Sequence, residues 1–160
     1  MRILVGSVGY FNLRDLSAGQ MIAERLQQEG LPGNVDVFDL SYGGPIATVH
    51  RLTETEPPYE RLIIVGAVAR PREKPSYRWY RWERNLPPPD EVQARVGEAV
   101  TGVIDLESFP IIAQQFGALP DDVRIVEIDA VETQAGLEPS AAVGAMLPDV
   151  CALVRRLVIE

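Results

Sequence analysis

The feature that most constrains the fold of this chain is the alternation, over residues 1–68, of short apolar runs with segments of helical periodicity. Residues 2–5 and 61–68 are apolar runs typical of strands that are buried on both faces of a parallel sheet. Residues 35–40 (VDVFDL) are predicted to form another strand, whereas residues 18–26 place apolar side chains on one helical face. This order requires parallel strands joined by right-handed crossovers, with helices on both faces of the sheet.

The second half of the chain continues this order less regularly. Residues 123–130 form another strand-like run, and residues 142–157 have the periodicity of a C-terminal helix. Residues 77–82 (YRWYRW) alternate aromatic and basic side chains, as an edge strand does. We predict a single α/β domain over residues 1–160, with three layers (α/β/α) around a mostly parallel, twisted sheet of about five strands. The edge strand is expected to run antiparallel.

Composition excludes several classes of function. The formal net charge of −8 disfavours general binding to nucleic acid or to anionic membranes. No apolar run approaches the roughly 20 residues that a membrane-spanning helix needs. The chain begins directly with a strand-like run and not with a signal segment, and its single cysteine forms no internal disulfide. We therefore expect a cytoplasmic protein with no nucleic-acid or membrane partner.

The residues that most often carry catalysis are scarce. His50 is the only histidine, whereas catalytic zinc sites usually use two or three imidazoles and a Ser-His-Asp triad needs one in a set position. We interpret His50 as a surface or hydrogen-bonded histidine without a catalytic role. Cys151 has no histidine near it in sequence, and we interpret it as a small buried side chain.

Three carboxylates remain as candidate ligands. Asp15 lies before the first predicted helix, Asp39 ends the second predicted strand, and Asp105 precedes a later helix. Ligands of open α/β sheets bind at the carboxyl ends of the strands, where these segments gather, and carboxylate oxygens suit hard or borderline metals. Asp15 also has a competing interpretation as the N-cap of the first helix.

The aromatic and basic stretch from residue 77 to residue 82 admits two binding functions. Basic and aromatic side chains together bind single-stranded nucleic acid, but the net charge of −8 disfavours that function. Exposed Trp, Tyr and Arg are also enriched at the energetic centres of protein interfaces. We therefore predict a partner-binding edge that uses Tyr77, Trp79 and Trp82.

Six segments carry a resemblance to a known family. In chain order they read RILVGSVGYFNLRDLSAG, VDVFDLSYGG, RLIIVGAV, YRWE, FGALPDDVRIVEID and LEPSAAVGAMLP. Their order and spacing resemble the nickel-iron hydrogenase maturation endopeptidases over nearly the whole chain. The resemblance implies the three-layer, phosphorylase/hydrolase-like α/β fold of that family. It also implies a partner, the hydrogenase large subunit, from which the family removes a C-terminal extension after nickel insertion.

The resemblance also implies three nickel-recognising side chains, and this chain lacks all of them. The acid at the start of the first helix falls on Leu16, the aspartate near the end of the third strand falls on Gly66, and the later histidine falls on or near Val103. None of these three side chains has a donor atom for a cation. Asp15 is adjacent to Leu16, but a shift of one residue along a helix rotates the direction of the side chain by about 100°. Asp15 would therefore not point where a side chain at residue 16 points.

Three hypotheses follow. The first is a catalytically degenerate, maturation-protease-like protein that needs no cofactor and docks on a nickel-iron hydrogenase large subunit or a maturation factor. The second is an active, nickel-recognising endopeptidase whose ligands have shifted to Asp15, Asp39 or Asp105. The third is a module that binds a small molecule or peptide unrelated to hydrogenases.

Overall fold

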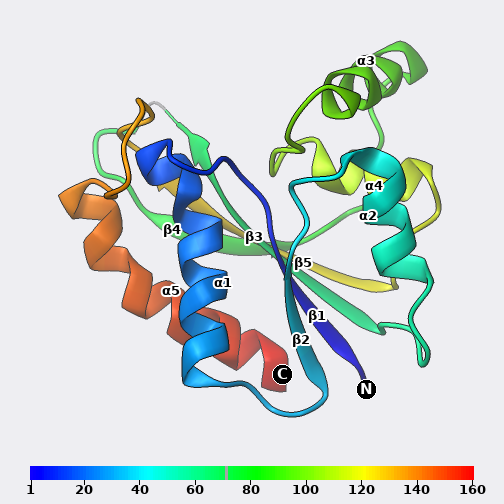
Figure 1. The fold of residues 1–160 in the computed structure, drawn as a ribbon, viewed down its shortest axis with the longest axis horizontal. Coiled ribbons are helices and arrows are strands. Elements are labelled where there is room, and N and C mark those ends of the chain that lie inside the picture. Colours follow the sequence, from blue (N-terminus) through cyan, green and yellow to red (C-terminus); the bar gives the residue numbers. More distant parts are fainter. Residues whose placement is uncertain (71) are drawn as a thin grey trace.

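Five strands form one sheet in the order β2-β1-β3-β5-β4, in a computed structural model that describes residues 1–70 and 72–160 (Figure 1). The strands are β1 (Ile3–Ser7), β2 (Val35–Asp39), β3 (Arg61–Ala69), β4 (Tyr77–Arg81) and β5 (Asp122–Ala130). All neighbouring pairs are parallel except β4 with β5, which is antiparallel. The predicted mostly parallel sheet and its antiparallel edge strand are therefore confirmed.

Helices cover both faces of this sheet. They are the short 3-10 helix η1 (Arg14–Ser17) and the α-helices α1 (Ala18–Glu29), α2 (Gly44–Thr53), α3 (Pro89–Val100), α4 (Phe109–Gln115) and α5 (Ala141–Ile159). Figure 1 shows α1 and α5 on one side of the sheet and α2, α3 and α4 on the other. This arrangement is the predicted three-layer architecture. Among the residues that the structure describes, none of the helices combines the length and the apolar character needed to cross a membrane.

The apolar run of β3 is continuous because each of its faces contributes to a separate core. Ile63 and Val65 pack with α1 and α5, whereas Leu62 and Ile64 pack with α2 and α4. All four side chains are at most 1% exposed. Burying each side chain of this size stabilises the fold by about 1.5–3 kcal/mol. Because its two faces belong to different cores, β3 contributes to the stability of both.

The connections place the candidate site. The chain leaves β1 through α1 on one face to reach β2, and leaves β2 through α2 on the other face to reach β3. The direction of winding therefore reverses between β1 and β3. In open α/β sheets, ligands bind at the carboxyl ends of the strands beside such a reversal. In this protein that region contains the loop after β1, the carboxyl half of β3 and the loop before α4.

Candidate functional site

The backbone at Gly66, near the carboxyl end of β3, is closely covered by two other segments. A Cβ atom at this position would lie 2.9 Å from the carbonyl oxygen of Val8, 3.0 Å from the Cγ2 of Val8 and 3.2 Å from the Cβ of Leu106. The Val8 amide donates to the carbonyl of Val65 at 3.0 Å, which fixes the loop after β1 against β3. The space that a carboxylate at residue 66 would need is therefore filled.

The other two positions matched to family ligands lie in different surroundings. Leu16, in η1, is half-buried and packs against the core on the side of α1 and α5. Val103 lines a cavity of about 240 Å³ together with Tyr10, Asp105 and Ser108. Across the described residues, 1–70 and 72–160, no three His, Cys, Asp or Glu side chains form a group able to hold a metal ion. The side chains of Leu16 and Val103, and the hydrogen of Gly66, carry no donor atom for a cation.

Asp15 does not cap the first helix, so that interpretation was wrong. The N-cap of α1 is Ser17, and Asp15 lies two residues earlier, within η1. The Asp15 carboxylate is fully buried and accepts four hydrogen bonds. Its donors are the backbone amides of Val131 (2.9 Å), Glu132 (2.8 Å) and Ser140 (2.7 Å) and the Ser140 hydroxyl (2.8 Å). Asp15 thus connects the N-terminal loop to the segment between β5 and α5.

This hydrogen bonding determines the charge state of Asp15. Burial by itself raises the pKa of the Asp15 carboxyl, but the backbone amides of Glu132, Ser140 and Val131 and the Ser140 hydroxyl lower it further than burial raises it. The net pKa is below the usual value of an aspartate, so the group is a carboxylate at neutral pH. Its oxygens are occupied by these four donors and are not directed at a metal.

Asp39 and Asp105 have separate structural roles. Asp39 ends β2, and its Oδ1 accepts a hydrogen bond from the Ser41 amide at 3.0 Å. It lines a cavity of about 390 Å³ that does not include Asp105. The Oδ1 of Asp105 accepts from the Ser108 amide at 2.8 Å, and its carbonyl accepts from the amide that begins α4. The three carboxylates named as substitute ligands are therefore not brought together.

A buried carboxylate that our sequence analysis did not identify lies beside Gly66. Glu127 is the register partner of Gly66 in the pairing of β3 with β5, and it is 2% exposed. Its Oε1 accepts from Arg70 at 3.1 Å and also from Arg78, while the Tyr80 hydroxyl lies 3.5 Å from its Oε2. The sequence signal was an acid placed between the apolar residues Val126 and Ile128 of β5.

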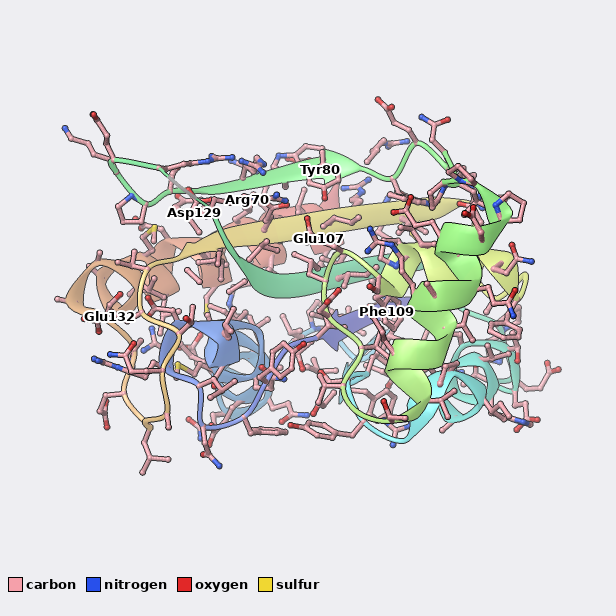
Figure 2. All side chains as sticks on the ribbon, turned by 90° about the horizontal axis from the view of Figure 1, so that it is seen from above. Arg70, Tyr80, Glu107, Phe109, Asp129 and Glu132 are labelled. Atoms are coloured by element: carbon pink, nitrogen blue, oxygen red, sulfur yellow. The ribbon has the colours of Figure 1, made fainter. Side chains whose placement is uncertain are left out.

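This cluster extends to the loop before α4. Arg70 also forms an ion pair with Glu107 at 3.2 Å, and Figure 2 shows Arg70, Tyr80 and Glu107 together at this edge of the sheet. Hydrogen bonding to Glu127 raises the pKa of Arg70, and burial raises the pKa of Tyr80. Two guanidinium groups thus neutralise Glu127, which is held as an ion-pair partner and is not a free ligand.

The aromatic residues of the predicted partner-binding edge do not share one face. Tyr77 packs against the core beside α1 and α5, whereas Trp82 packs against the opposite core and donates from Nε1 to the Oε1 of Gln114 at 2.6 Å. Trp79 is 37% exposed, with the Arg124 guanidinium 5.9 Å from its ring. Of the three, Trp79 is the most available to a partner. In the described part of the chain, β4 pairs with β5 alone, which leaves its other side as a sheet edge.

The histidine and the cysteine are placed as the sequence indicated. His50 is exposed on α2 and pairs with Glu54 one turn later. Cys151 is 4% exposed within α5, and burial raises the pKa of its thiol. A buried thiol with a raised pKa is a poor nucleophile.

Comparison with known proteins identifies the fold. No protein-family model and no curated protein sequence matches the chain. Solved structures match over nearly its whole length. The hydrogenase maturating endopeptidase HybD from Escherichia coli has 23% sequence identity and a TM-score of 0.69, over 96% of this chain and 90% of that one. The [NiFe] hydrogenase maturation protease HybD from Thermococcus kodakarensis has 20% identity and a TM-score of 0.70, over 98% and 99%.

A third structure extends this likeness to another type of maturation protease. The [NiFe] hydrogenase maturation protease HycI from Thermococcus kodakarensis has 15% identity and a TM-score of 0.64, over 99% of this chain and 93% of that one. The chain therefore has the fold of the hydrogenase maturation proteases, as the sequence resemblance implied. At these identities the likeness establishes the fold, and function must be argued from the residues.

Proposed function

We propose that this chain is a maturation-protease-like protein that docks on a nickel-iron hydrogenase large subunit, or on a maturation factor, without cleaving it. Two observations support this proposal. The fold matches solved structures described as hydrogenase maturation proteases over at least 96% of the chain. The matched ligand positions, Leu16, Gly66 and Val103, lack donor atoms.

The closed backbone at Gly66 is the observation that carries the proposal. A hydrogen-bonded loop and the Leu106 side chain fill the space where a carboxylate would enter. A transition metal needs several oxygen, nitrogen or sulfur ligands at about 2.0–2.3 Å from a common point. Filling that space with hydrocarbon and a backbone carbonyl disfavours nickel recognition. The filled space at Gly66 is separate from the exposed edge of β4, through which we propose that a partner is bound.

The first prediction concerns nickel and cleavage. We expect the purified protein to retain less than about 0.1 equivalent of nickel after equilibrium dialysis at micromolar metal, because the ligand set is missing. We also expect it to leave a nickel-loaded large-subunit precursor at full length, as judged by mass spectrometry. The HybD protease of Escherichia coli, incubated with its own precursor, serves as the positive control. One equivalent of bound nickel or a trimmed precursor would establish the alternative, an active peptidase with shifted ligands.

The second prediction concerns docking through the edge of β4. Trp79 is the exposed aromatic side chain of the predicted edge, and truncating such a residue at an interface commonly weakens binding by tenfold or more. We expect Trp79→Ala to weaken co-purification with the large subunit by about tenfold while the fold is retained. Phe116→Ala, at a similarly exposed aromatic immediately after α4, is the matched control and should have no effect. If the wild-type protein fails to associate, or if both variants associate equally well, docking by this edge is refuted.

A further inference from the structure

The outer edge of β4 carries backbone groups that are directed away from the sheet. Ser76 and Trp82, which flank this strand, both hydrogen-bond to β5 through their backbones, at 2.9 and 3.0 Å. Successive residues of a strand direct their N–H and C=O groups to opposite sides, so the residues at odd-numbered positions face outward. These residues are Tyr77, Trp79 and Arg81. Figure 2 shows β4, which carries Tyr80, along the outer margin of the molecule, where a further strand can be added.

The sequence of β4, YRWYR, is complementary to itself in the antiparallel direction. When two copies align over the full strand, Trp79 lies opposite Trp79 of the second copy. Tyr77 then lies opposite Arg81 of the second copy, and Arg78 likewise lies opposite Tyr80. Every arginine thus faces a tyrosine, and no two charges of the same sign are paired. Opposed like charges destabilise a sheet, whereas aromatic pairs and contacts between an arginine and an aromatic ring stabilise it.

The backbone of β4 permits this alignment and disfavours its neighbours. Residues that exchange hydrogen bonds across an antiparallel pair must direct their backbone groups toward each other. A two-fold axis at Trp79 meets this condition, because it places outward-facing residues opposite outward-facing residues. An axis at Arg78 would set two arginines opposite each other. An axis at Tyr80 would pair Tyr77 with Glu83, which lies beyond the end of β4.

The side chains of this edge are accessible and the edge is basic. Trp79 is 37% exposed and Tyr80 is 38% exposed. Arg81 is exposed and forms no ion pair with any residue of the described ranges 1–70 and 72–160. The chain carries a net charge of −8, but β4 contains no acid, so the acidic surface of one copy does not meet that of another here. The π face of an opposed tyrosine supplies the negative potential that Arg81 lacks in the monomer.

We propose that two copies of this chain associate through β4, as an antiparallel pair about a two-fold axis at Trp79, so that their sheets become continuous. The assembly closes at two copies, because both use the same edge. Trp79 packs on Trp79 of the second copy, and Arg81 lies over the Tyr77 ring of the second copy. The dimer occupies the edge that the proposed function assigns to a hydrogenase partner, so only the separated monomer binds such a partner. The dimer itself does not depend on that function.

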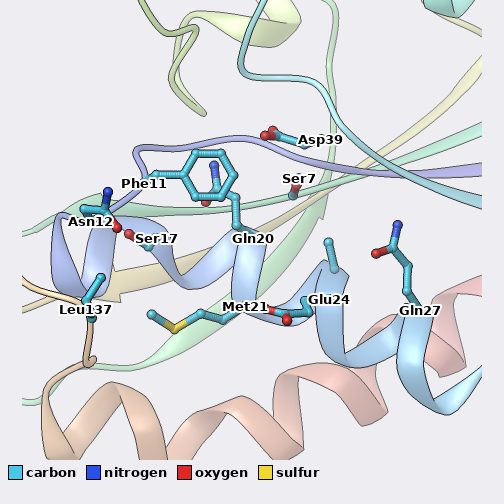
Figure 3. Close-up of a pocket in the computed structure, with 11 residues that line it drawn as sticks. Ser7, Phe11, Asn12, Ser17, Gln20, Met21, Glu24, Gln27, Asp39 and Leu137 are labelled. Carbon is cyan, nitrogen blue, oxygen red and sulfur yellow. The ribbon is translucent and has the colours of Figure 1, made fainter.

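The opposite edge of the sheet supplies a matched control. In the strand order, β2 is the strand farthest from β4. Asp39 ends β2 and lines the cavity of about 390 Å³ that Figure 3 shows, so the dimer leaves that cavity uncovered. Phe38, also in β2, is 46% exposed. Phe38→Ala therefore removes an exposed aromatic side chain from the edge that is not used.

The test is sedimentation velocity of the purified protein alone, from about 10 to about 500 µM, since weak association is usual for a small interface. We expect the wild type to change from monomer to dimer over this range. Trp79→Ala should raise the dissociation constant by about tenfold, with the fold checked by circular dichroism, and Phe38→Ala should leave it unchanged. A monomer throughout, species larger than two copies, or equal dimerisation of Trp79→Ala and the wild type overturns the proposal.

A second measurement tests the register with oxidised glutathione as the oxidant. Trp79→Cys places two cysteines opposite each other, with Cα atoms about 5.5 Å apart, which a disulfide spans. Arg81→Cys, at another outward-facing position, places them about 14 Å apart. We expect Trp79→Cys to form a covalent dimer at least about tenfold faster than Arg81→Cys. The native Cys151 is 4% exposed and reacts in neither. Equal rates, or no covalent dimer of Trp79→Cys, overturn the proposed register.

Discussion

Replacing Gly66 by Asp is expected to lower the free energy of unfolding by about 4 kcal/mol or more, without creating a nickel site. The new Cβ would lie 2.9 Å from the Val8 carbonyl oxygen, and that atom belongs to backbone that cannot move independently. The added carboxylate would also be buried beside Glu127, whose charge is already neutralised by two arginines. Urea denaturation monitored by circular dichroism measures the loss through the shift of the midpoint.

Two further substitutions separate the steric part of this effect from the electrostatic part. Gly66→Ala adds only the Cβ and should cost about 1–3 kcal/mol, the usual range for overpacking. Gly97, exposed on α3, is the matched glycine, because a Cβ there meets nothing within 4 Å. Gly97→Asp should therefore change the stability by less than about 1 kcal/mol. Wild-type stability in Gly66→Asp, or stoichiometric nickel binding by it, would show that the space is open.

Replacing Asp15 by Ala is expected to destabilise the protein by about 3 kcal/mol at neutral pH. The substitution leaves the backbone amides of Val131, Glu132 and Ser140 without their acceptor in a buried region. Hydrogen bonds to a charged group contribute about 1.5–3 kcal/mol each, and buried donors left unpaired are costly. Chemical denaturation at pH 7 measures the change. Asp149→Ala, at an exposed position of α5, is the control and should stay within about 0.5 kcal/mol of the wild type.

The effect of Asp15→Ala should depend on pH in a defined direction. The folded-state pKa of Asp15 lies below its unfolded value, so its stabilisation is fully present above the unfolded pKa and is lost as the pH falls through the folded pKa. The difference between wild type and variant should therefore shrink as the pH is lowered below about 4. Asp122 also has a lowered pKa, because burial raises it but hydrogen bonds from Arg124 and Arg61 outweigh that effect. This residue is present in both proteins, so its contribution to the pH dependence cancels. A difference that stays constant from pH 7 to low pH would show that Asp15 is not held as a carboxylate.

Local patterns in the sequence determined the architecture. Parallel strands and helices on both faces were predicted from the apolar runs of β1 and β3 and from the helical periodicity of α1. This is possible because the buried face of a helix or strand repeats its apolar residues with the period of that element. The alternation in β4 predicted a sheet edge for the same reason. The apolar character of Leu16, Gly66 and Val103 was also readable directly, since it needs only the residue identity.

Only the tertiary structure decided what those residues contact. Asp15 was interpreted as a helix cap from its neighbours in sequence, but its hydrogen-bond donors lie between 116 and 125 residues away. The same holds for Gly66, which is covered by Val8 from one loop and Leu106 from another. The position of a residue before a helix or within a strand is encoded by its neighbours. Which loops meet above the carboxyl ends of the strands depends on how the layers pack, and no local period carries that information.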